Sequence, residues 1–295
     1  MTAKPSLAAE PADDVDASSA PLVEHLAELR NRLIWSLLAF VIAMTACFTF
    51  WRPIYDFLTV PLCKALEAHG QACELVFLSL QEGFFLAFSI SMMAGLVLSF
   101  PIISYQLWRF VAPGLYKNEK RAFLPFLLAS PLMFIGGAAF AYYVIAPMAF
   151  DFFLGFQTAE TLTGVQDLEA GEASIIFQGS AKAYLSLTMA FIVSFGLCFQ
   201  LPVLLTLLGR AGIVTAAGLG RMRKYALVGI LIMAAMATPG PDIMSQVILF
   251  AAVYPLYEIS IWLVRRHEKT VEARMRAEGT LGENETLYGD DEAAS

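Results

Sequence analysis

Residues 83–108 read GFFLAFSISMMAGLVLSFPIISYQLW, a run without a single Asp, Glu, Lys or Arg. A helix needs ~20 apolar residues to cross the ~30 Å hydrocarbon core of a bilayer, so this run is long enough to span a membrane. The chain contains five more uncharged runs, at residues 33–51, 122–150, 183–209, 225–241 and 243–257. The sequence therefore predicts an all-α polytopic membrane protein with six transmembrane helices, of which the last two are short.

The composition supports the same class. Only 15% of the 295 residues are charged and 58% are hydrophobic, whereas a soluble domain has about a quarter charged residues. The net charge of −7 disfavours a nucleic-acid partner. The four cysteines show no C-x-x-C spacing and no nucleotide or zinc motif is present, so we expect no cofactor and no metal.

Basic residues indicate the orientation of the chain. With six spans and the N-terminus inside, 16 of the 19 Lys and Arg residues fall on the cytoplasmic side, which is the positive-inside pattern with both termini in the cytoplasm. A re-entrant hairpin formed by the last two runs would leave this tally unchanged, so it stays an alternative to two crossings.

The ends of the chain differ from its middle. Residues 1–20 are rich in Ala, Pro, Ser and Asp, and the tail is acidic and polar. We expect a disordered N-terminal arm at 1–20, a six-span membrane domain at 21–266 and an acidic disordered tail at 267–295. Prolines within the apolar runs should bend their helices into a concave wall; they stand at positions 101, 125, 131, 147, 202 and 255.

Few polar groups interrupt the apolar runs, and each is a candidate for a structural or coupling role. Gln200 is the deepest of them. Asp242 and Gln246 open the last helix, where an acid is favourable at the N-terminus. Glu258 is expected to pair with a base, with Arg265 and Arg266 two turns further on.

The first extracytoplasmic segment, residues 52–82, contains Cys63 and Cys73. In an oxidising compartment these cysteines could form a disulfide. Two free thiols are the alternative, because pairing requires Cα atoms within ~7 Å.

Before the first span, Glu24, Glu28 and Arg32 fall on one helical stripe at i, i+4 steps. The loop after the second span contains one acid, Glu119, among four bases. From the residues alone, both Glu28 and Glu119 fit a solvated surface.

Two motifs, HLAELRNR at 25–32 and YQLWRFVAPGLYKNE at 105–119, resemble those of the TatC family, and shorter matches continue in order to residue 266. The resemblance implies a non-enzymatic receptor of the twin-arginine (Tat) translocase in the bacterial inner membrane, driven by the protonmotive force. It implies that Glu28 and Glu119, with Arg30 and Phe110, bind Arg-Arg signal peptides of folded cargo at the cytoplasmic face. The implied partners are TatA- and TatB-type single-span subunits, the lipid bilayer and further copies of the chain.

Where many relatives carry a glutamate in the fourth span, this chain has Gln200, which cannot ionise. The alternative function is a secondary transporter for a small solute, which predicts intramembrane ionisable groups and two related halves. An intramembrane hydrolase ranks last, because His25, His69 and His267 lie outside the apolar runs.

Overall fold

The computed structural model describes residues 14–111, 120–162, 179–237, 243–280 and 282. In chain order the elements are α1 (Asp14–Thr49), α2 (Trp51–Ala68), β1 (Leu75–Val76), α3 (Glu82–Val111), α4 (Lys120–Phe140), a π-helical turn (Ala141–Ile145), α5 (Ala146–Leu162), β2 (Gly179–Ser180), α6 (Ala181–Cys198), α7 (Leu201–Arg210), α8 (Ala216–Arg221), α9 (Arg223–Ala237) and α10 (Ile243–Ala277).

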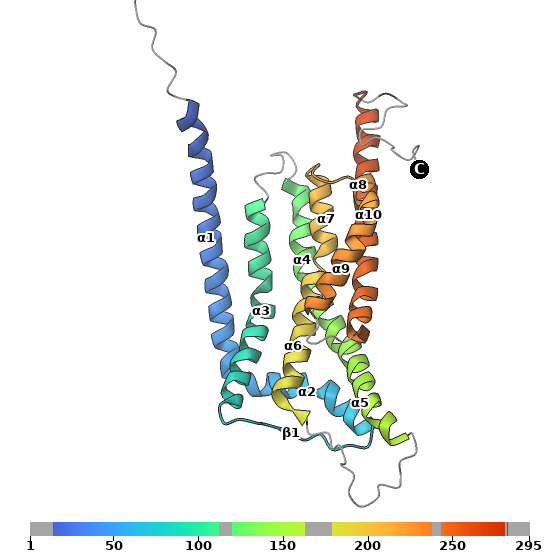
Figure 1. Ribbon diagram of the computed structural model, residues 1–295. Helices are drawn as coiled ribbons and strands as arrows, with labels where there is room; N and C mark the ends of the chain where they lie inside the picture. Colours follow the sequence, from blue (N-terminus) through green and yellow to red (C-terminus); the bar gives the residue numbers. More distant parts are fainter. Residues whose placement is uncertain (1–13, 112–119, 163–178, 238–242, 281, 283–295) are drawn as a thin grey trace, which may run out of the picture.

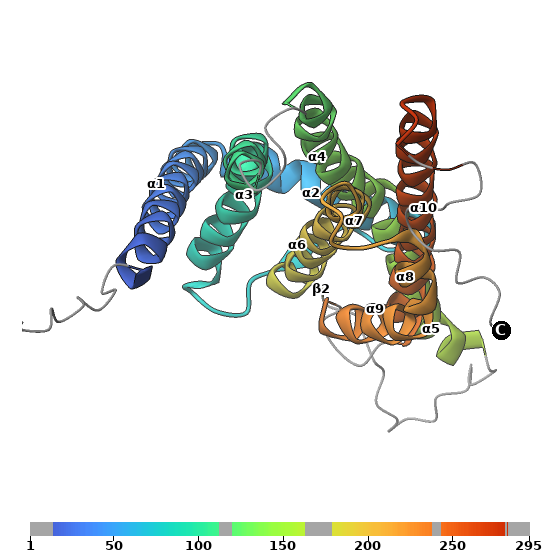
Figure 2. The same ribbon diagram turned by 90° about the horizontal axis from the view of Figure 1, so that it is seen from above.

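The long helices stand side by side, and α2 lies across one end of them (Figure 1). We call this the α2 end; α1 begins and α10 finishes at the opposite end. Seen from above, α1 lies at one side of the molecule next to α3, and α10 lies at the other side (Figure 2).

Five helical stretches are long and apolar enough to cross a membrane: Leu26–Thr49, Glu82–Phe110, Phe126–Gly155, Ala181–Arg210 and Gln246–Ala277. They have 24 to 32 residues, about 36–48 Å at ~1.5 Å per residue. The prediction of an all-α polytopic membrane protein is therefore confirmed.

Of the two final spans that were expected to be short, only the first is short in the structure. α9 has 15 residues, roughly 22 Å of helix, and is not among the five stretches found in the described ranges. α10 has 35 residues and is not short, because the Glu, Lys, Arg and Ala residues after its apolar part are good helix formers.

The expected boundaries of the two arms also need correction. α1 is already helical at Asp14 and α10 remains helical to Ala277, so 14–20 and 267–277 are not unstructured. Part of the reason is a tertiary contact in the C-terminal extension: the buried Glu268 carboxylate accepts a hydrogen bond of 2.8 Å from the backbone N–H of Ala216 at the start of α8. A polar composition does not prevent helix when such contacts form.

Proline interrupts regular α-helix at two positions. Pro147 follows the π-helical turn, where it removes one backbone N–H from the helical ladder. Pro202 lies in the first turn of α7, just after α6 has ended at Cys198. α3 and α10 continue through Pro101 and Pro255.

At Gly95 and Gly137, neighbouring helices approach backbone to backbone. A Cβ at Gly95 would lie 2.7 Å from the Cα of Met44, so α1 and α3 approach backbone to backbone. A Cβ at Gly137 would lie 2.6 Å from the carbonyl oxygen of Phe195, so α4 approaches α6 equally closely. Small residues such as Gly137 commonly allow this close approach between membrane helices.

Side chains and backbone tie the loops together at the α2 end. Cys63 and Cys73 form a disulfide with Cα atoms 5.0 Å apart, which resolves the choice that the sequence left open. β1 and β2 pair in parallel, with Leu75 opposite Gly179. The buried Glu82 carboxylate accepts a hydrogen bond of 2.7 Å from the N–H of Leu78 and one of 3.4 Å from the hydroxyl of Ser180, the second residue of β2.

Candidate functional site

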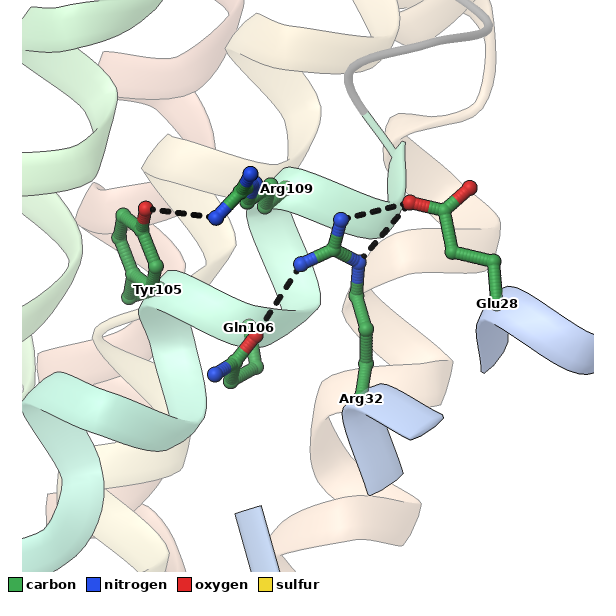
Figure 3. Close-up of polar contacts among 5 residues, drawn as sticks. All are labelled: Glu28, Arg32, Tyr105, Gln106 and Arg109. Atoms are coloured by element: carbon green, nitrogen blue, oxygen red, sulfur yellow. Dashed lines mark hydrogen bonds and ion pairs between the residues drawn. The ribbon is translucent and has the colours of Figure 1, made fainter. Parts of the chain in front are cut away.

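A polar cluster joins α1 to α3 near the end opposite α2 (Figure 3). Glu28 and Arg32 lie one turn apart on α1, and Gln106 and Arg109 lie one turn apart on α3. Residues at i, i+3 and i+4 share a helix face, and α1 packs along α3. The packing therefore brings both polar pairs to the same place.

Arg32 is the centre of this cluster. Its Nη2 and Nε donate to the same oxygen, Oε1 of Glu28, at 2.6 and 3.1 Å. Its Nη1 donates to Oε1 of Gln106 at 3.1 Å. The Arg32 side chain is 17% exposed and the Glu28 side chain 35%, so the ion pair is partly shielded from solvent. Oε2 of Glu28 points away from Arg32 (Figure 3) and accepts no bond from the described residues.

Arg109 contributes a second guanidinium. Its Nη1 donates to the Tyr105 hydroxyl at 3.2 Å, and its guanidinium carbon lies 5.9 Å from the centroid of the Tyr105 ring. Within the described part of the chain Arg109 makes no ion pair with a carboxylate.

The cluster lines a cavity of about 250 Å³ that is open to the surroundings. Its lining combines one carboxylate, two guanidinium groups, two side-chain amides and an indole, from Glu28, Asn31, Arg32, Trp35, Gln106 and Arg109. A carboxylate with one oxygen still available accepts hydrogen bonds from a cationic ligand, and an indole face also attracts a guanidinium. The cavity therefore offers an incoming cationic group one carboxylate oxygen and an indole face, beside the guanidinium groups of Arg32 and Arg109.

The predicted binding residues do not all meet here. Arg30 is exposed on α1, two residues from Glu28 and therefore not on its face. Phe110 is half-buried on α3, one turn beyond Gln106. Glu119 lies outside the described residues, as does Asp242.

In addition to Arg32, four cavity residues were not predicted as site residues from the sequence: Asn31, Trp35, Gln106 and Arg109. A signal was present for the first two, because they follow Glu28 at i+3 and i+7, the spacing of one helix face. Gln106 is on another helix, and no local pattern connects it to Glu28.

The remaining polar candidates hold helices together. Gln200 and Ser130 hydrogen-bond each other between the α6–α7 break and α4. Gln246 Nε2 donates to the carbonyl of Leu231 at 3.1 Å, tying α10 to α9.

Glu258 pairs with a base, as expected, but that base belongs to another helix. Arg223 at the start of α9 donates from Nε and Nη2 to the two carboxylate oxygens of Glu258, at 2.9 Å each. Tyr254 donates a further bond of 3.2 Å to the same group. The expected bases, Arg265 and Arg266, lie two turns further along α10, about 10 Å away along the helix axis.

These features define a multi-spanning α-helical membrane protein with a polar cavity towards one end of the bundle. A family model described as Sec-independent protein translocase protein (TatC) matches residues 24–251. The chain belongs to the TatC family, whose members are protein translocase components and not enzymes.

Similarity to individual members extends over most of the chain. The TatC protein of Magnetococcus marinus is 42% identical over 250 residues, 85% of this chain and 86% of that protein. The Escherichia coli K12 TatC protein is 36% identical over 245 residues, 83% of this chain and 88% of that protein. A crystal structure of the twin arginine translocase receptor TatC is 36% identical, has a TM-score of 0.70, and covers 82% of this chain and 98% of its own.

Proposed function

We propose that this protein is the receptor of a twin-arginine translocase and that it binds Arg-Arg signal peptides of folded cargo at the cytoplasmic face. The observation that supports this most directly is Glu28, whose Oε2 accepts no hydrogen bond from the described residues and lies in a polar cavity. Two similar crystal structures are of proteins named as twin arginine translocase receptors, and the membership of the chain in that family favours the same role here.

The geometry of a contact between a guanidinium and a carboxylate accounts for a preference for arginine over lysine. A guanidinium presents parallel N–H groups that match the two oxygens of a carboxylate, whereas a lysine ammonium is a point charge without that geometry. We propose Glu119 as a second carboxylate that receives the neighbouring arginine. Arg30 and Phe110 complete the recognition region in this proposal, and the apolar part of the signal peptide lies along the helices and the lipid.

The proposed orientation places the Glu28 end of the bundle in the cytoplasm of a bacterial inner membrane. The bias of Lys and Arg towards that side supports it, as does the start of α1 and the finish of α10 at the same end (Figure 1). In this arrangement α9 and α10 are the fifth and sixth spans, and the short α9 crosses where the bilayer is locally thinned.

The partners in this proposal are single-span subunits of the TatA and TatB type and further copies of the chain. The proposed energy source is the protonmotive force. A translocase subunit requires other subunits to form a passage for folded proteins. Gln200 has no titratable group, so proton coupling in this chain would have to use other residues.

Site-specific photo-crosslinking tests the proposed site. A photoreactive amino acid is placed at position 31, which lines the cavity, in membranes that carry out export. A leader peptide with Ser-Arg-Arg should form an adduct there, and the same peptide with Lys-Lys should not. The matched control position is 273, near the other end of the chain on α10. Equal adducts at both positions, or none at 31 during active export, would remove the site.

A further inference from the structure

We propose that Arg32 is an internal competitor for the arginine site. It occupies Glu28 while no signal peptide is bound, an incoming arginine displaces it, and Gln106 then retains it. This inference rests on the function proposed above, because it assigns a regulatory contact to the same cavity.

The contact between Arg32 and Glu28 has the geometry of a competitor. Both donors of Arg32, Nε and Nη2, reach one oxygen, Oε1 of Glu28, at 3.1 and 2.6 Å. A second guanidinium can approach Oε2, but a bidentate contact needs both carboxylate oxygens. A peptide arginine therefore binds in full only when Arg32 gives up Oε1.

Gln106 lowers the cost of this release. Arg32 is only 17% exposed, and a shielded guanidinium without a partner is strongly disfavoured. Its Nη1 already donates to Gln106 Oε1 at 3.1 Å, from a helix 74 residues away in the chain. When Arg32 leaves Glu28, this neutral amide still holds it inside the cavity.

Competition of this kind also sharpens selectivity. A ligand must bind Glu28 more strongly than Arg32 does. Specificity is the difference between the affinities of two competing ligands. A peptide guanidinium can bind more strongly than Arg32 because it contacts both carboxylate oxygens, whereas a lysine ammonium has no parallel pair of donors. Arg32 therefore excludes lysine-containing leaders more strongly than arginine-containing ones.

Opposite effects of two substitutions test the proposal. The full-length chain is placed in lipid nanodiscs, and binding of a fluorescent Ser-Arg-Arg leader peptide is compared with that of its Lys-Lys version. Arg32→Gln should bind the Arg-Arg peptide about two- to fivefold more tightly, the size expected on removing one partly exposed ion pair, and should discriminate less against Lys-Lys. Gln106→Leu should bind it more weakly, because Arg32 then depends on Glu28 alone. The double variant should behave like Arg32→Gln.

Arg274→Gln is the matched control. It removes an arginine from an i, i+4 pair with Glu278, in which Arg274 Nε lies 3.1 Å from the carboxylate, and it should leave peptide binding unchanged. Arg32→Lys, which keeps the charge but loses the two parallel donors, should bind slightly more tightly than the unchanged chain and serves if Arg32→Gln does not fold.

A purely structural Arg32, which only ties α1 to α3, predicts a different pattern. In that case Arg32→Gln and Gln106→Leu weaken peptide binding alike, and that result would overturn the proposal. Glu28→Gln separates a failure of the competitor proposal from a failure of the proposed receptor site. If Glu28→Gln loses the peptide but Arg32→Gln gains nothing, only the competitor is refuted. If Glu28→Gln binds normally, the proposed receptor site itself fails.

Discussion

Gln200 and Ser130 hydrogen-bond to each other in both directions. The Ser130 hydroxyl donates to Gln200 Oε1 at 2.7 Å, and Gln200 Nε2 donates to the Ser130 carbonyl at 2.9 Å. Gln200 lies between α6 and α7, where the fourth membrane stretch leaves regular helix, and Ser130 lies on α4 and is buried. The deepest polar side chain predicted from the sequence is therefore an interhelical bridge that fastens this break to α4.

Removal of the bridge should destabilise the fold modestly. Gln200→Leu and Ser130→Ala should each lower the free energy of unfolding by ~0.6–1.7 kcal/mol, the range of hydrogen bonds between membrane helices. The double variant should lose less than the sum, because the two side chains share one interaction. Chemical unfolding followed by tryptophan fluorescence in one detergent measures this.

Ser91→Ala provides the control for that series. The buried Ser91 hydroxyl donates at 2.6 Å to the carbonyl of Ala87 in its own helix, so its loss removes a hydrogen bond within a helix and not one between helices. Fully additive losses in the Gln200 and Ser130 variants would show that the two side chains are not coupled.

Gly137 and Gly136 should respond differently to the same substitution. Gly137→Ala should cost ~1–3 kcal/mol, the usual penalty for overpacking, because the new Cβ would lie 2.6 Å from the carbonyl oxygen of Phe195. A Cβ added at Gly136 would meet no atom of the described residues within 4 Å, so Gly136→Ala should keep or raise stability, since alanine favours helix. Thermal unfolding of the two variants side by side measures the difference. Equal midpoints would contradict the close approach of α4 to α6.

The disulfide should be detectable by thiol counting. The chain has four cysteines, of which Cys47 and Cys198 are free and buried. Denatured, non-reduced protein should therefore show two reactive thiols, and reduced protein four. Joint replacement of Cys63 and Cys73 by Ala should lower the free energy of unfolding by about 2–3 kcal/mol, because the closed loop between them is short. Four thiols before reduction would contradict the pairing.

The sequence was a good guide to the membrane helices because the bilayer sets a minimum length for an uncharged run. Residues 83–108 predicted α3 almost to its ends. The same reasoning failed at the end of α10, where charged residues continue a helix beyond the apolar run. The first charged residue indicates where a helix leaves the hydrocarbon core. It does not indicate where the helix itself ends, because backbone hydrogen bonding can continue.

The polar site was only partly predictable. Spacing on one helix placed Arg32 beside Glu28, as an i, i+4 pair requires. The contact of Arg32 with Gln106 depends on how α1 packs against α3, which is made possible by Gly95. Similarly, Glu258 pairs with Arg223 from α9 and not with a base on its own helix. Contacts between distant segments come from packing, and a single sequence does not encode them in any local pattern.

The proposed function depends on the Glu28 carboxylate receiving a guanidinium of the signal peptide. Equilibrium binding of a fluorescent Ser-Arg-Arg leader to the full-length chain in nanodiscs tests it most directly, with Glu28→Gln against the unchanged protein and Glu278→Gln as a control at an exposed carboxylate of the same kind. Glu28→Gln should weaken binding by about tenfold or more, since a hydrogen-bonded charge pair is worth ~1.5–3 kcal/mol, and Glu278→Gln should bind normally. Equal affinities for all three proteins would show that Glu28 does not receive the arginine.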